Sequence, residues 1–255
     1  MKNFTAWITG TVKWLFDFKD WKQLLRSIPA ATVALFTVCT VTMNLAANKI
    51  VWSGLKIGDN YFISITGGVF LSWAVFLIMD MVTRTFGPKA SIKLNLFGAA
   101  TNALAINFLG IIASVPSAFP FPGAAASFDA VFGFTGNGVQ PWQILTASTI
   151  AYIVSGILNA LINACIGKAF RKNPDGIPAF ITRSYISTML GQFADNFIFT
   201  GIAFGLIAHY YSPFTITGMA LIGAFIELFC EILFSPVAYI KCKKWQQEGV
   251  GSYEL

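Results

Sequence analysis

Long apolar stretches are the feature that most constrains the fold of this 255-residue chain. A helix needs about 20 mainly apolar residues to cross the hydrocarbon core of a bilayer. Only 11% of the residues are charged, whereas a soluble domain carries about 25%. Six apolar windows of suitable length can be read, at residues 29–50, 61–82, 92–115, 142–166, 183–208 and 214–240. The sequence therefore predicts an all-α, polytopic membrane protein with a bundle of six transmembrane helices.

The segment before the first window has a different character. Residues 1–28 carry five Lys or Arg, and their aromatic side chains Trp7, Trp14, Phe18 and Trp21 recur on one helical face. This pattern predicts an N-terminal amphipathic helix in the membrane interface, and a leader without fixed structure is the alternative. The expected domains are a cytoplasmic amphipathic segment (1–28), a transmembrane domain (29–240) and a cytoplasmic tail (241–255).

The distribution of basic residues predicts the orientation. Of 17 Lys and Arg, 15 precede the first window, follow the last, or lie around the second-to-third and fourth-to-fifth connections. Lys49 and Lys56 lie around the first-to-second connection. The positive-inside rule then places both termini in the cytoplasm of a multi-pass protein in the cytoplasmic (inner) membrane. The net charge of +6 reflects this topology and does not indicate nucleic-acid binding, because the basic residues form no single stripe.

Ionisable and amide side chains interrupt the fifth window near its middle. Gln192, Asp195 and Asn196 lie there, and Ser187 shares a helical face with Asp195 because the spacing is a multiple of four. An ionisable residue at the bilayer centre costs about 2.5 to 3.5 kcal/mol, so it usually faces a cavity or a partner. These residues are the first candidates for a substrate site.

Other windows supply further polar groups. Amides and acids follow at Asn44, Asn48, Asn159 and Glu227. They predict a mid-membrane pocket among the first, fourth, fifth and sixth helices, although each Asn could instead bond between helices for about 0.6 kcal/mol. Carboxylates, amides and aromatic rings suit a flat, neutral heterocycle such as a guanine. A proton path through Asp195, Glu227 and Glu231 is the competing interpretation.

A weak internal repeat relates the fourth and fifth windows at an offset of 36 residues. It pairs Ser148 with Ser184, Gly156 with Gln192, and Asn159 with Asp195. Transporter repeats place a binding site where the two units meet and rock against each other, but three matched positions also fit chance similarity. Gly201 and Gly205 are expected to form a close-packing surface for such movement.

Five runs of letters resemble a known family. They are NLAANKI (44–50), FLIMDMVTRTFGPKAS (76–91), FDAVFG (128–133), RSYISTMLGQFADNFIF (183–199) and SPVAY (235–239). They look like the vitamin uptake transporter family, in particular the queuosine precursor transporters. The resemblance implies a six-helix carrier that imports 7-deazaguanines, such as 7-cyano-7-deazaguanine, its aminomethyl analogue or queuine, for tRNA modification. Arg84 stands where the family usually has Glu, and Asn159 where it often has Asp, which leaves substrate identity and ion coupling open.

Asp80 and Arg84 are one turn apart at the end of the second window. They could form an ordinary ion pair that anchors the helix end. Alternatively, Asp80 could close a gate with Arg84 or Arg183. The outer connection at 116–141 is expected either as a surface loop or as a segment whose FDAVFGF core dips into the interface.

The same sequence is also compatible with other functions. A substrate-binding subunit of an energy-coupling-factor importer also has six helices, and Ala30 and Ala34 would offer a small-residue docking surface. An enzyme is disfavoured, because His209 is the only histidine and no GxSxG, HExxH or P-loop motif is present. A carrier for another vitamin or nucleobase, a structural subunit and a homo-oligomer remain open, and no cofactor or metal is expected.

Overall fold

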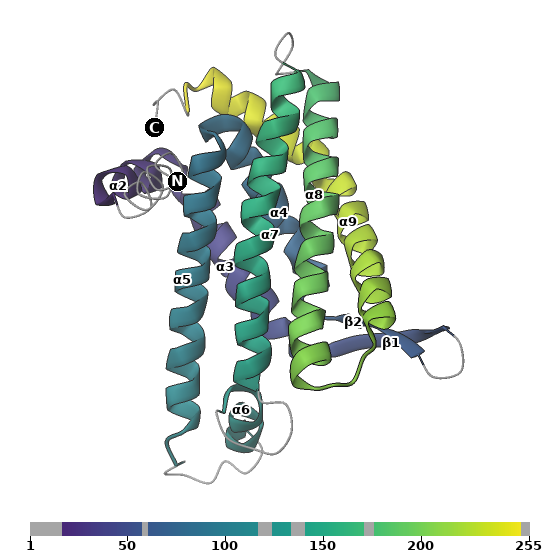
Figure 1. Cartoon of the computed structure of the whole chain (residues 1–255). Coiled ribbons are helices and arrows are strands. Elements are labelled where there is room, and N and C mark those ends of the chain that lie inside the picture. The colour runs from purple at the N-terminus through teal and green to yellow at the C-terminus, as the bar shows by residue number, and fades with distance from the viewer. Residues whose placement is uncertain (1–16, 58–60, 117–123, 134–140, 171–175, 251–255) are drawn as a thin grey trace, which may run out of the picture.

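The computed structural model describes residues 17–57, 61–116, 124–133, 141–170 and 176–250 (Figure 1). Trp7 and Trp14 lie outside the described residues. The elements in chain order are α2 (Phe18–Ser27), α3 (Ala30–Ala46), β1 (Ile50–Ile57), β2 (Tyr61–Thr66), α4 (Val69–Phe86), α5 (Pro88–Ala113), α6 (Ala124–Phe132), α7 (Pro141–Ala169), α8 (Ile177–Thr200), the π-helical segment η1 (Gly201–Ile207) and α9 (Pro213–Gln247).

The long helices form a bundle. Figure 1 shows α5, α7, α8 and α9 side by side, with α3 and α4 behind them. The C-terminal end of α9 and α2 lie toward one end of the bundle, and the β1–β2 hairpin and α6 lie at the other. The connections therefore divide the molecule into two ends separated by the length of the helices.

Among the described residues, five helical spans are long and apolar enough to cross a membrane, namely α4, α5, α7, α8 with η1, and α9. A sixth is obtained if α2 and α3 count as one span bent by 101°. The bend lies at Pro29, whose ring fixes φ at −53° and removes the amide donor. The predicted all-α polytopic class is confirmed.

Helix α2 is amphipathic in the described residues. Leu24 is buried, whereas Lys19, Lys22 and Arg26 are exposed. Asp20 forms an ion pair with Lys93 of α5, with Lys93 Nζ 3.3 Å from Asp20 Oδ2. This ion pair holds α2 against the end of the bundle. The interfacial position itself stays a prediction.

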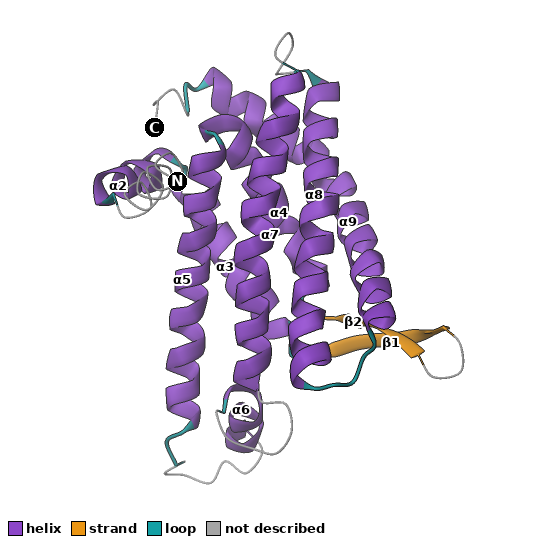
Figure 2. Ribbon diagram, viewed as in Figure 1, coloured by secondary structure: helices purple, strands orange, loops and turns teal. Residues whose placement is uncertain are grey.

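The prediction that the second helix begins at residue 61 is wrong. Residues 61–66 form β2, which pairs antiparallel with β1 (Figure 2), and α4 begins only at Val69. The first window is likewise too long, because α3 ends at Ala46 and Ile50 already belongs to β1. Both strands are rich in β-branched and aromatic residues, and a short apolar run of this kind cannot be told from a helix by periodicity alone.

Two glycines let the hairpin return against the end of α3. A Cβ on Gly67 would lie 2.9 Å from the Ala46 carbonyl oxygen, and one on Gly68 would lie 2.8 Å from that of Met43. Any larger residue would push β2 and α4 away from α3. The hairpin is thus held directly beside the polar interior described below.

Three further expectations are corrected or refined. A Cβ on Gly201 would meet no atom within 4 Å, whereas one on Gly205 would lie 2.9 Å from Ile216 Cδ1, so only Gly205 is closely packed. The FDAVFGF run falls largely within the short helix α6. Helix α9 extends through Gln247, into the segment expected as a tail.

Candidate functional site

The interior of the bundle is polar and its outside is apolar. Leu104, Leu206 and Phe229 are 73%, 72% and 62% exposed on the surface of the helices. Side chains that would face water in a soluble protein are buried instead. They include Asn44, Ser72, Asp80, Asn159, Asn163, Ser184, Ser187, Thr188, Gln192, Glu227 and Glu231. Because lipid is apolar, this inversion places the functional chemistry inside the bundle.

Asp80 of α4 is the centre of one group of buried polar side chains. Its carboxylate is 2% exposed and accepts hydrogen bonds from Asn159 Nδ2 of α7 at 2.8 Å and from Ser184 Oγ of α8 at 2.6 Å. Ser187 and Thr188 add longer contacts at 3.3 and 3.4 Å. We call these five residues, with Glu231 of α9, the Asp80 cluster. It joins α4, α7, α8 and α9.

The two arginines of the gate hypothesis take different positions. Arg183 donates from Nε and Nη2 to Asn163 Oδ1, at 3.2 and 3.0 Å. Asn163 in turn donates to Ser187 Oγ at 3.3 Å, so Arg183 is linked to Asp80 through two neutral side chains. The guanidinium of Arg84 lies over the Phe180 and Tyr239 rings, 5.1 and 5.5 Å from their centroids. The gate stays a prediction.

A second group of polar side chains lies nearer the hairpin, and we call it the outer cluster. Its members are Ser72, Ser155, Asp195, Asn196 and Glu227. Glu227 is 1% exposed and accepts from Ser72 Oγ and, at 2.8 Å, from Asn196 Nδ2. Asp195 is half-buried and accepts from Ser155 Oγ at 2.7 Å.

Gln192 lies between the two clusters on α8. It follows Thr188 of the Asp80 cluster by one turn and precedes Asn196 of the outer cluster by one turn. Its side chain is 0% exposed, and neither its Nε2 nor its Oε1 has a hydrogen-bond partner among the described residues. A buried polar group left without a partner costs about 1 to 3 kcal/mol. Gln192 therefore offers donors and an acceptor that a bound molecule could satisfy.

A small cavity lies at the outer cluster, and Gln192 does not line it. Its volume is about 20 Å³, and a neighbouring hollow adds about 10 Å³. This is room for about one water molecule. The lining of the larger of the two is Met43, Ala47, Thr66, Gly68, Val69, Ser72, Ser148, Asp195, Asn196, Phe199 and Glu227. The helices are therefore closed around the site in this conformation.

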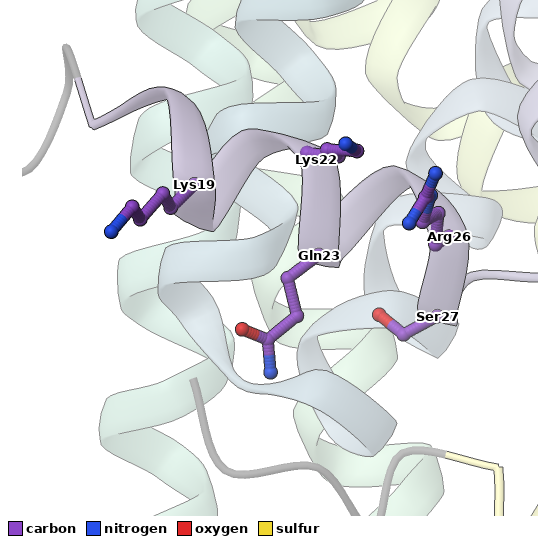
Figure 3. Close-up of a pocket in the computed structure, with 5 residues that line it drawn as sticks. All are labelled: Lys19, Lys22, Gln23, Arg26 and Ser27. Atoms are coloured by element: carbon purple, nitrogen blue, oxygen red, sulfur yellow. The ribbon is translucent and has the colours of Figure 1, made fainter.

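A larger hollow of about 440 Å³ lies elsewhere, on α2 (Figure 3). Its lining consists of Lys19, Lys22, Gln23, Arg26 and Ser27. One exposed helix supplies all of these residues, and none belongs to the two clusters. The small polar cavity, in which side chains from α3, α4, α7, α8 and α9 converge, is the better candidate site.

The structure brings most of the predicted site residues together. Asp195, Asn196 and Glu227 meet in the outer cluster, while Asn159 and Ser187 bond to Asp80. Three predicted residues remain. Gln192 lies between the two clusters on α8 and does not line the cavity. The other two are the amides of α3 and its end. Asn44 accepts from Ser148 Oγ beside the cavity, whereas Asn48 lies beyond the end of α3, donates to the Leu45 carbonyl at 3.2 Å and does not line the cavity.

Several participating residues escaped the sequence-based prediction of the site. Ser72, Ser155 and Thr188 donate directly to the carboxylates of Glu227, Asp195 and Asp80. A usable signal was present on α8, because Ser184, Thr188, Gln192 and Asn196 follow one another at intervals of four and form a single stripe. Within the described ranges, no group of three or more His, Cys, Asp or Glu is arranged to hold a metal ion.

Comparison with known proteins gives one family. The sequence profile of vitamin uptake transporters matches residues 66–241, which run from the end of β2 to near the end of α9 and contain both clusters and Gln192. No curated protein and no solved structure matches the chain. Because the matched region covers more than half of its residues, the chain belongs to the vitamin uptake transporter family.

Proposed function

We propose that this membrane transporter imports a queuosine precursor, a 7-deazaguanine such as 7-cyano-7-deazaguanine, 7-aminomethyl-7-deazaguanine or queuine. Membership of the family supports a vitamin-like substrate. The observation that carries the proposal is Gln192, a fully buried amide whose nitrogen and oxygen have no partner in the described chain. A transporter that must bind a donor-rich and acceptor-rich molecule has a reason to keep such a group unpaired.

The chemistry of the neighbouring residues fits a guanine-like edge. The Asp195 carboxylate lines the cavity and can accept in parallel from the ring N1–H and the exocyclic 2-amino group. The Gln192 amide can pair with the ring carbonyl. The Phe199 ring lines the same cavity and supplies an aromatic face. Together these groups would recognise both the edge and the plane of the heterocycle.

The route to the site follows from the shape of the cavity. A purine-sized molecule does not fit into about 20 Å³, so α7, α8 or α9 must move for the substrate to enter. The cavity is lined by Thr66 and Gly68, at the exit of the hairpin. We therefore place the entrance at the hairpin end, with opening and closing of the bundle as the transport step.

The proposal is tested by thermal shift with protein purified in detergent. The ligands are 7-cyano-7-deazaguanine, its aminomethyl analogue, queuine and guanine. We expect a shift of several degrees for at least one deazaguanine and its loss in Asp195→Asn, because the amide cannot accept two hydrogen bonds from the same edge. Asp129→Asn makes the same chemical change on the exposed face of α6 and is expected to keep the shift.

Absence of any shift in the wild-type chain would refute the deazaguanine assignment. A shift that survives in Asp195→Asn would leave the ligand class standing and remove Asp195 from the site. The two results separate the identity of the substrate from the location of its site.

One observation favours a second candidate, the substrate-binding subunit of an energy-coupling-factor importer. Ala30 and Ala34 of α3 are both exposed, so this small-residue surface remains available to another helix. Purification from a native membrane in mild detergent distinguishes the candidates. Co-purifying ATPase subunits would support the importer, and transport by the chain alone in proteoliposomes would support the carrier.

A further inference from the structure

We infer that Asp80, Ser184 and Glu231 form a proton-binding site that holds one proton between its two carboxyl groups and couples that proton to transport. The coupling rests on the proposed transport function, whereas the proton site does not. The three residues come from α4, α8 and α9. All three side chains are buried, at 2%, 1% and 0% exposure.

The positions of the oxygen atoms require a proton. Ser184 Oγ lies 2.6 Å from Asp80 Oδ2 and 2.5 Å from Glu231 Oε1. A serine hydroxyl has one hydrogen, so it can donate to only one of these oxygens. An ionised carboxylate has no hydrogen to give in return. Both short contacts can be hydrogen bonds only if one of the two carboxyl groups is protonated and donates to Ser184.

The remaining contacts identify the protonated group. Asp80 also accepts from Asn159, Ser187 and Thr188, which together stabilise a negative charge. Glu231 Oε2 has no hydrogen-bond partner among the described residues. The proton therefore belongs on Glu231, which donates to Ser184, and Ser184 donates to Asp80.

The charged and titratable groups of the surrounding helices are compatible with this assignment. On α8, Arg183 donates to Asn163 rather than directly into the pair of carboxyl groups. On α9, Glu227 lies one turn from Glu231 and is bonded to Ser72 and Asn196. Four further groups on these helices and on α5 have partners of their own. Arg84 lies over Phe180 and Tyr239, Asp195 is bonded to Ser155, Tyr185 is bonded to Ser235, and Lys93 is paired with Asp20. The thiol of Cys242 on α9 is buried and lies within electrostatic range of Asp80.

Release of this proton changes the packing of the bundle. When Glu231 ionises and its proton passes to water, two carboxylates face a single hydroxyl hydrogen. Their repulsion separates α4 from α9. Gln192 lies eight residues from Ser184, about 12 Å along α8. The proton thus favours the closed arrangement, and its loss favours opening of the substrate site.

Infrared spectroscopy of the detergent-purified full chain, without substrate, tests the proton site. A buried carboxylic acid gives a carbonyl band that shifts on deuteration. We expect this band at neutral pH in the difference between the wild type and Glu231→Gln, since glutamine keeps the donor to Ser184 and removes the proton. Glu248→Gln, which changes an exposed residue of the tail, is the matched control and is expected to leave the band unaltered.

A wild-type minus Glu231→Gln spectrum without this band would overturn the inference, as would a band that disappears only in Asp80→Asn. The coupling has its own test in proteoliposomes with radiolabelled 7-cyano-7-deazaguanine. We expect Glu231→Gln to exchange the probe more slowly than the wild type, because the neutral side chain favours the closed arrangement, and to lose accumulation driven by an inward proton gradient. Retained accumulation would overturn the coupling, whereas a wild type that never transports the probe would refute the proposed substrate and leave the infrared result intact.

Discussion

One buried amide, that of Gln192, differs from the amides that hold the helices of this protein together. Asn95 of α5 is also 0% exposed, but its Nδ2 donates to the Ile153 carbonyl at 3.1 Å, so it links α5 to α7. Gln192 makes no such bond. The same residue chemistry therefore serves helix packing at one position and is left unused at the other.

Replacement of Gln192 by leucine separates stability from binding. We expect Gln192→Leu to raise the free energy of unfolding by about 1 to 3 kcal/mol, because an unpaired buried amide is removed. We also expect it to lose the thermal shift caused by the deazaguanine. Thermal unfolding in detergent, with and without ligand, measures both effects.

The matched control is Asn95→Leu, which breaks a bond between helices and is expected to lower the midpoint of unfolding. If Gln192→Leu also unfolded at lower temperature than the wild type, Gln192 would be a structural residue. Its role in substrate recognition would then have to be abandoned.

The rarest residues were the easiest to select from the sequence as candidates for the site. Asp195 and Gln192 could be selected because an acid and an amide in an apolar helix need a physical reason. Ser72 and Ser155 could not be selected in this way. Burial of a hydroxyl group in a helix costs little free energy, because the hydroxyl often bonds to the backbone of its own helix. The partnership of Ser184 with two acids depends on the rotation of three helices, which no single segment encodes.

At the scale of elements, α8 lies close to α4 and α7 at one glycine, Gly191. A Cβ on Gly191 would lie 2.8 Å from Phe76 Cε1 of α4 and 3.1 Å from Asn159 Cβ of α7. Gly201, ten residues further on, has no such neighbour within 4 Å. The first glycine sets the distance between helices at the Asp80 cluster, and the second does not.

These two glycines give a paired prediction. Gly191→Ala is expected to destabilise the protein by about 1 to 3 kcal/mol, because the added methyl group overpacks the interface. Gly201→Ala is expected to be neutral or to stabilise by up to about 1 kcal/mol, since a helical glycine loses more backbone entropy than alanine. Thermal unfolding of the two variants side by side measures the difference, and equal midpoints would disprove the packing role of Gly191.

The helices were predictable and the hairpin was not. Windows of apolar residues identify α5, α7, α8 and α9 because a bilayer demands a minimum length. The same criterion misassigned residues 61–66. Their composition is apolar enough for a transmembrane helix, but in the structure they form a strand that pairs with β1. Only contact with another strand distinguishes the two outcomes, and that contact is not visible in a window.

At the scale of the whole molecule, the basic residues predict the orientation of the bundle. Cysteine labelling in a cysteine-free background tests it. We expect Lys56→Cys, at the hairpin end, to react with a membrane-impermeant maleimide added to intact cells. Lys168→Cys, at the opposite end of the bundle, is expected to react only after permeabilisation. The reverse pattern would mean that the protein has the opposite orientation in the membrane. The proposed entrance at the hairpin end would then face the cytoplasm, as in an exporter.

The nearly filled cavity beside Asp195 has a thermodynamic consequence. Where only about 20 Å³ is free, substrate and helix packing compete for the same space, so the measured affinity equals the intrinsic affinity multiplied by the fraction of open molecules. Variants that loosen the bundle without touching the site would then bind more tightly while melting earlier. At the proposed site, stability of the closed bundle and affinity for the substrate would therefore be opposed.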